Sequence, residues 1–178
     1  RDNIRITEVM YNPDTSESEY IELKNIGNQS INLYLCKFDE GIEFTFPNLI
    51  LNPGESTIVV EDISDFEDGY LQTGLTYNIA GEFENQTSLS NGGERIVLKD
   101  AFGREIHNFE YNDFYPITDG YGFSICINDF NSLNLATWDD PSNWSPSTSY
   151  KGSPCEDSNS SMAEPGSIVI NEILAHQD

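Results

Sequence analysis

Basic residues are scarce in this sequence. Only 8 of its 178 residues are Lys or Arg, whereas 31 are Asp or Glu, so the formal net charge at pH 7 is −23. An interface with nucleic acid or with an anionic membrane needs clustered cations that neutralise phosphate groups. Eight dispersed cations cannot supply such a cluster, and the composition therefore excludes nucleic acid and an anionic membrane surface as partners.

Long hydrophobic runs are missing as well. A membrane-spanning helix needs roughly 20 consecutive apolar residues, and no segment approaches that length, so we expect no membrane insertion. Hydrophobic residues still make up 37% of the chain, which is enough for the core of one domain. Alanine is rare, while Asn, Ser and Gly are frequent between β-branched and aromatic segments. This pattern favours an all-β domain.

Short alternating segments separated by turn signals predict the strands. The clearest are residues 4–10, 20–23 and 56–61, together with a hairpin formed by residues 95–99 and 105–109. About eight such strands at roughly ten-residue spacing predict a β-sandwich. Residues 62–91 are less regular and contain an acidic stretch, and residues 128–166 read as loops anchored by Trp138 and Trp144.

The beginning and the end of the chain resemble each other. Residues 4–10 (IRITEVM) and 168–174 (IVINEIL) share their apolar positions and a glutamate. We therefore predict one complete domain over residues 1–160, a linker over 161–167, and the first strand of a truncated second copy over 168–178. Because an apolar strand with unpaired backbone groups seeks a sheet edge, we expect residues 168–174 to pair within the same molecule or with a neighbour.

Several motifs follow one another in order along the chain. The most specific is Tyr20-Ile21-Glu22-Leu23-Lys24-Asn25, and the others are ITEVMYNP at 6–13, INL at 31–33, LNPGE at 51–55, LSNGGE at 89–94, DGYGFS at 119–124, NWS at 143–145 and GSP at 152–154. This series resembles the bacterial lamin tail domain, a module also found at the tails of nuclear lamins. Two positions depart from the family pattern, since Cys36 replaces a tryptophan and Cys155 replaces a glycine.

The resemblance implies an immunoglobulin-like β-sandwich of about eight to nine strands. It also implies an accessory module of a larger secreted or surface bacterial protein, without a catalytic site of its own. We expect a non-catalytic interaction or spacer module that makes protein–protein or surface contacts. The alternative is a carbohydrate- or polymer-binding module attached to a secreted hydrolase, in which Tyr111, Phe114, Tyr115, Trp138 and Trp144 would be recruited as platforms rather than as core residues.

Catalytic residues are hard to assemble from this sequence. The predicted domain holds one histidine, His107, inside an alternating strand, and nothing places a nucleophile and a carboxylate beside it. We expect His107 to be a surface or edge-strand residue, and we expect no enzymatic activity.

Calcium is the more serious candidate ligand, because it prefers carboxylate, amide and carbonyl oxygens from flexible loops. No cofactor is required by the sequence, but Asn12, Asp14 and Glu19 form one oxygen-rich turn, and the family alignment places Asp119 near the same end. Two further acidic groups are Asp62, Asp65, Glu67 and Asp68, and Asp129, Asn131, Asp139 and Asp140. The alternative is an acidic surface that is simply solvated.

Glu22 lies opposite the apolar Ile21 and Leu23 on its predicted strand. If loops cover that face, we expect its carboxylate to accept backbone hydrogen bonds beside Glu8.

The three cysteines allow at most one intramolecular disulfide. The family position of Cys36 predicts a buried thiol, which leaves Cys126 and Cys155 as the pair if a disulfide forms.

Overall fold

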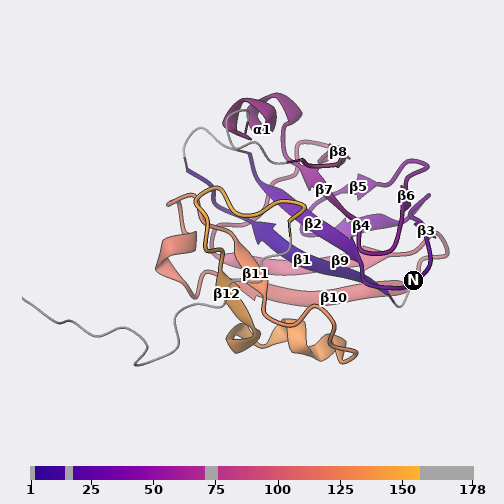
Figure 1. The fold of residues 1–178 in the computed structure, drawn as a ribbon. Helices are drawn as coiled ribbons and strands as arrows, with labels where there is room; N and C mark the ends of the chain where they lie inside the picture. The colour runs from indigo at the N-terminus through magenta and orange to yellow at the C-terminus, as the bar shows by residue number, and fades with distance from the viewer. Residues whose placement is uncertain (1–2, 15–17, 71–75, 157–178) are drawn as a thin grey trace, which may run out of the picture.

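The computed structural model describes residues 3–14, 18–70 and 76–156. These residues form twelve strands, one α-helix and three short 3-10 helices (Figure 1). The predicted linker and the predicted strand at residues 168–174 lie outside the described residues.

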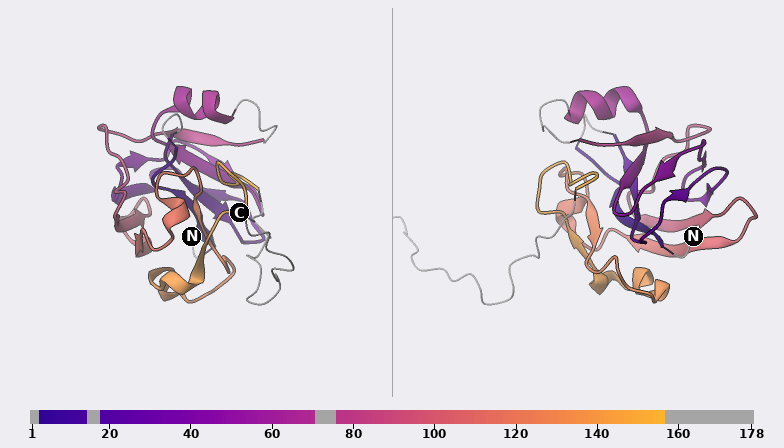
Figure 2. Two further views of the ribbon diagram at one scale, coloured as in Figure 1. Left: turned by 90° about the vertical axis from the view of Figure 1, so that its left-hand side faces the viewer. Right: turned by 45° about the vertical axis from the view of Figure 1, so that its right-hand side comes forward.

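Two main sheets form the sandwich, as the turned views in Figure 2 show. The six-stranded sheet has the order β12 (Trp144–Pro146), β11 (Ile125–Ile127), β1 (Ile4–Met10), β2 (Tyr20–Asn25), β7 (Ser56–Val60) and β8 (Ile79–Glu82). The four-stranded sheet has the order β10 (Glu105–Asn112), β9 (Gly93–Lys99), β4 (Lys37–Glu40) and β5 (Phe44–Thr45), and β3 (Ile31–Asn32) pairs with β6 (Ile50–Leu51). All pairs are antiparallel except β7 with β8.

The immunoglobulin-like sandwich predicted from the sequence is confirmed, although twelve strands replace the expected eight to nine. The strands that the pattern did not indicate are β4, β6, β8 and β12, which are two to four residues long and too short for a clear alternation. The predicted hairpin is present as β9 and β10, with Glu105 opposite Lys99.

The main core lies between the two sheets. It joins side chains from β1 and β2, such as Ile6 and Leu23, to side chains from the facing sheet, such as Phe38 and Leu98.

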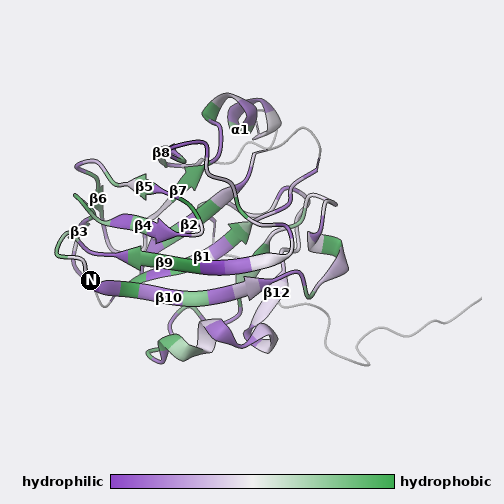
Figure 3. Ribbon diagram, turned by 180° about the vertical axis from the view of Figure 1, so that it is seen from behind, coloured by the Kyte–Doolittle hydropathy of each residue, from purple (hydrophilic) through white to green (hydrophobic). Residues whose placement is uncertain are grey.

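Along β10, buried and more exposed residues alternate from His107 to Asn112, as expected for a strand with one buried face. On β9, by contrast, Ile96, Val97 and Leu98 are buried in succession. Figure 3 shows the hydrophobic and hydrophilic stretches of both strands.

The six-stranded sheet is covered on its outer face too. A second apolar cluster, formed by Met10, Tyr20, Ile58, Val60, Phe66 and Tyr70, lies beneath the helix α1 (Ile63–Tyr70). Every residue of β1, β2 and β7 is therefore buried. Polar side chains on these strands must find partners inside the protein, because an unpaired buried polar group is costly.

The helix α1 was not predicted from the sequence, which read its residues as an irregular acidic stretch. Asp62 caps the helix, since its Oδ1 accepts a hydrogen bond from the Asp65 amide at 2.9 Å. Phe66 and Tyr70, one turn apart, stack with ring centroids 4.1 Å apart and are buried. With only two buried residues in eight, the helix has too short an apolar period to be recognised. No described helix is long and apolar enough to cross a membrane.

Both tryptophans are anchors, as predicted. Trp138 lies in η2 (Leu135–Asp139), is fully buried, and donates from Nε1 to the Ile6 carbonyl at 2.8 Å. Trp144 follows η3 (Pro141–Asn143), and its Nε1 donates to the Trp138 carbonyl at 2.9 Å. These bonds tie the loops after β11 to the core.

The segment 147–156 closes over the outer face of the six-stranded sheet. The amide of Ser153 donates to Glu8, and the amide of Cys155 donates to Glu22. Gly152 makes this approach possible with φ +76°, because a Cβ at this position would overlap the Tyr20 hydroxyl and Glu8 Oε1.

Replacing Gly152 by alanine is expected to destabilise the fold strongly. The left-handed backbone costs alanine about 1–2 kcal/mol, and displacing two buried side chains raises the total to about 2–5 kcal/mol. Gly103→Ala is the matched control, since Gly103 has the same φ of +76° and a Cβ added there would meet nothing within 4 Å. Urea unfolding of both variants measures the difference, and equal losses would contradict the role of the close approach.

Candidate functional site

Two glutamates lie side by side in the six-stranded sheet. Glu8 on β1 and Glu22 on β2 are cross-strand partners, and both are buried. Glu8 accepts hydrogen bonds from the hydroxyls of Tyr20, at 2.7 Å, and Ser124, and from the Ser153 amide at 2.8 Å. Glu22 accepts from the hydroxyl of Thr7 and from the amide of Cys155.

This environment holds a proton on the glutamate pair. Burial, reinforced by the negative charge of Glu8, raises the pKa of Glu22 to about 8. The expectation that Glu22 accepts a backbone hydrogen bond beside Glu8 is confirmed. Because segment 147–156 covers the pair, its carboxyl oxygens are used to close the domain rather than to meet a ligand.

The four sequence-predicted calcium ligands are divided among different surroundings. Asn12 and Asp119 meet, since Asn12 Nδ2 donates to Asp119 Oδ1 at 2.6 Å. Asp14 accepts a hydrogen bond from the Tyr150 hydroxyl at 2.9 Å.

Glu19 has a different environment and is buried. Its Oε2 accepts from the Leu89 amide at 2.6 Å, and burial raises its pKa to about 8. It therefore serves as a local acceptor for the loop before β9.

The other acidic groups serve mainly as local caps. Asp62 caps α1, Asp140 accepts from the Ser142 amide at 3.0 Å, and Asp129 accepts from the Asn131 amide at 3.0 Å. Asp139 accepts from the Glu110 amide at 3.2 Å and so covers part of the β10 edge. Among residues 3–14, 18–70 and 76–156, no three His, Cys, Asp or Glu side chains converge in a way that could hold a metal ion.

His107 does lie on an edge strand, but the expectation of a surface residue is wrong. The side chain on β10 is only 1% exposed, and its ring lies 5.0 Å from that of Trp138. Its Nε2 bonds the Ile4 carbonyl at 3.2 Å, and Nδ1 has no hydrogen-bond partner. Burial, with Arg5 nearby, lowers the pKa of His107 to about 3, so the imidazole is neutral and part of the core.

The structure contains no disulfide among its three cysteines, all of which are described. Cys36 is a buried thiol, as predicted, whereas the suggested Cys126–Cys155 pair is not formed. Cys126 lies opposite Glu8 on the sheet, and the Cys155 amide is held by Glu22. Burial raises the pKa of the Cys155 thiol to about 12, which disfavours the reactive thiolate.

The predicted aromatic platforms are mostly core residues. Tyr111, Tyr115 and Trp144 line a small apolar cleft with Phe114, but Tyr111 and Trp144 are buried. Phe114 is 66% exposed and meets the edge of the Tyr115 ring at 5.1 Å between centroids. Phe114 is therefore the member of the set that a ligand could reach.

The sequence did not predict a surface hollow beside the β9–β10 turn. This hollow, named here the Arg–Leu groove, has a volume of about 650 Å³ and is lined by Arg5, Asp100, Arg104, Glu105, Ile106, Leu133 and Leu135. It lies where the β9–β10 turn meets the loop before η2, so its two sides come from segments far apart in the sequence. The sequence signal for this groove was a pair of leucines, Leu133 and Leu135, in the otherwise polar segment 131–135.

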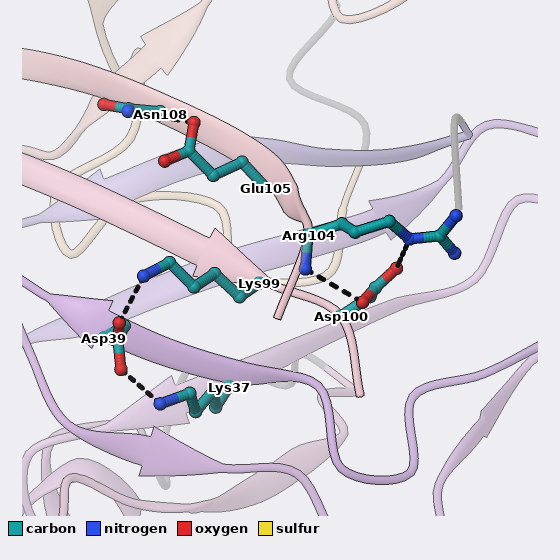
Figure 4. Close-up of polar contacts among 7 residues, drawn as sticks. All are labelled: Lys37, Asp39, Lys99, Asp100, Arg104, Glu105 and Asn108. Atoms are coloured by element: carbon teal, nitrogen blue, oxygen red, sulfur yellow. Dashed lines mark hydrogen bonds and ion pairs between the residues drawn. The ribbon is translucent and has the colours of Figure 1, made fainter. Parts of the chain in front are cut away.

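A cationic strip borders the groove on the four-stranded sheet. Asp39 on β4 accepts hydrogen bonds from both Lys37 and Lys99, which lowers its pKa to about 2 (Figure 4). Lys99 is the cross-strand partner of Glu105 in β10. With Arg104 at the turn, three of the eight cations of the chain lie in this small region.

Comparison with known protein families gives one match. A family model described as Lamin Tail Domain matches residues 1–113, which is more than half of the chain. A search of the curated proteins found no significant match. The matched part ends just after β10, so β11, β12 and the closing segment lie beyond it.

Glu22→Gln is expected to flatten the dependence of stability on pH. A carboxyl group whose pKa rises from 4.5 to about 8 on folding contributes stability that is complete below pH 4.5 and lost as the pH rises to 8. Removing this group reduces the slope by at most about 1.4 kcal/mol per pH unit. Urea unfolding at pH 5, 6, 7 and 8 measures it.

Glu55→Gln is the control for this series. Glu55 is exposed and its pKa is lowered by hydrogen bonds from Asn52, so it titrates below this range. An unchanged slope in Glu22→Gln would show that the proton is not held there.

Proposed function

The chain belongs to the lamin tail domain family, and on that premise we propose that it is a non-catalytic interaction or spacer module. It would belong to a larger extracellular or cell-surface bacterial protein and would contact other protein domains or a surface. Pairing of residues 168–174 with a sheet edge, within or between molecules, is part of the same proposal and concerns residues outside the described ranges.

The observation that carries the proposal is the Arg–Leu groove. Leu133 is 86% exposed, and Leu135 beside it is partly exposed. Both leucines lie on a surface that is otherwise mostly polar and acidic. Exposed apolar residues rimmed by polar groups are typical of protein-contact sites.

The surroundings of His107 support a non-catalytic role. Its ring contacts Trp138 and Phe109, and its bonded nitrogen faces a backbone carbonyl instead of a nucleophile. A general base must reach the proton that it removes, and this imidazole is enclosed in the core.

A carbohydrate-binding module is the second candidate, and the exposed ring of Phe114 favours it. Sugar rings stack on exposed aromatic faces, and Glu110 and Asn112 add polar groups at the same cleft. Substituting either tryptophan would test folding rather than binding, because both are buried.

The two functions predict different sensitivity to treatment of the binding target. We expect fluorescently labelled chain to bind bacterial cell envelopes, protease treatment of the envelopes to abolish binding, and periodate oxidation of their glycans to leave binding unchanged. The reverse pattern, together with loss of binding in Phe114→Ala, would overturn the protein-contact function in favour of the carbohydrate module. Ile117→Ala, another exposed residue nearby, is the matched control.

Calcium stabilisation stays a prediction for this module. A ligand that binds only the folded state stabilises it by about 2.7 kcal/mol at 100 times its Kd. Thermal melts of the full chain in EDTA and then in millimolar calcium should show a higher Tm with calcium and not with magnesium, and Asp119→Asn should reduce the rise. An unchanged Tm would leave the carboxylates as surface charge.

A further inference from the structure

We propose that the Arg–Leu groove binds an extended segment of a partner protein in which an apolar side chain stands beside a carboxylate. This inference rests on the proposed function as a protein-contact module and names the chemistry of its partner. The groove has an apolar side, which would receive the apolar side chain, and a cationic side, which would receive the carboxylate.

The apolar side is a loop held in place with its leucines outward. Arg5 donates from Nε and Nη2 to the Ser132 carbonyl at 3.3 and 3.2 Å, just before Leu133. On the other side, Asn134 accepts a hydrogen bond from the Ala136 amide at 3.3 Å. The loop is thus held by hydrogen bonds on both sides of Leu133, which is 86% exposed.

The cationic side is Arg104, whose guanidinium is only partly used. Its Nε donates to Asp100 Oδ2 at 2.9 Å, and its side chain is 68% exposed. The two terminal nitrogens point away from Asp100, as Figure 4 shows. A planar pair of N–H donors aimed outward is suited to a carboxylate, which it can hold through two parallel hydrogen bonds.

The nearby acids do not cancel this preference. Asp100 Oδ1 already accepts the amides of Phe102 and Arg104, at 2.7 and 3.1 Å, and its other oxygen holds Arg104. Glu105 lies across from Lys99 and accepts from Asn108 Nδ2 at 3.1 Å. The groove lining therefore pairs two arginines with two acids that already accept hydrogen bonds, and Arg104 is the more exposed of the two arginines.

The size of the groove and the charge of the chain restrict the occupant. A volume of about 650 Å³ suits a few residues of an extended segment better than a large flat interface. A second copy of this chain would bring another strongly acidic surface against the first, and long-range repulsion opposes that encounter. A short segment delivers one carboxylate to Arg104 without that penalty.

Three blocked tetrapeptides test the proposal by titration into the full 15N-labelled chain. Their central pairs are Leu-Asp, Leu-Asn and Ala-Asp, at concentrations up to about 10 mM, which covers weak affinities. We expect the Leu-Asp peptide to shift the amide signals of Leu133 and Leu135 and the Nε–H signal of Arg104. We expect it to bind about fivefold more tightly than either of the other two, the ratio for one exposed contact.

Variants at exposed positions provide the second readout. Arg104→Gln and Leu133→Ser should each weaken binding of the Leu-Asp peptide by about fivefold. Arg95→Gln is the matched control, because Arg95 is an exposed arginine on the same hairpin outside the groove, and it should leave the Kd unchanged. Equal binding of all three peptides, or no shift at the groove, would overturn the proposal.

Three other results would overturn the groove proposal for different reasons. Shifts confined to another surface would remove the groove while leaving a protein-contact module, whereas periodate-sensitive envelope binding would remove the proposed function itself. Displacement of the Leu-Asp peptide by a tighter-binding peptide of residues 167–176 would show that the groove receives the C-terminal part of this chain instead of a separate partner.

Discussion

The paired glutamates Glu8 and Glu22 set the constraint on which the rest of the domain depends. Two carboxyl groups side by side in a buried sheet are tolerable only when one keeps its proton and donors saturate the oxygens. The donors come from four places in the chain, namely Thr7, Tyr20, Ser124 and the backbone of Ser153 and Cys155. The pair thereby joins the first strands to the last described segment and requires a glycine at position 152.

The segments that cover the two glutamates determine which sheet face stays exposed to solvent. With α1 and segment 147–156 over the outer face of the six-stranded sheet, the open sheet face belongs to β4, β9 and β10. That face carries Lys37 and Lys99, and Arg104 follows at the turn, so three of the eight cations of the chain lie near the Arg–Leu groove.

Two groups of buried ionisable residues oppose each other in their dependence on pH. His107 is neutral in the folded state, so its contribution to stability is present above its unfolded pKa and is lost as the pH falls toward 3. Glu19 and Glu22 contribute stability that is lost as the pH rises toward 8. Together, these three residues favour the folded state most at a pH between about 3 and about 8.

Residue alternation and turn chemistry are local, and for that reason the sequence by itself determined the all-β sandwich, the β9–β10 hairpin, the anchoring role of both tryptophans and the family. Tertiary structure alone decided which polar residues are buried. His107 lies on the edge strand its pattern indicates, yet Trp138, 31 residues away, covers it. The helix α1 depends on burial of Phe66 and Tyr70 against β2, and the Arg–Leu groove depends on loops brought together by folding. Such contacts between distant segments leave no periodic trace in the sequence.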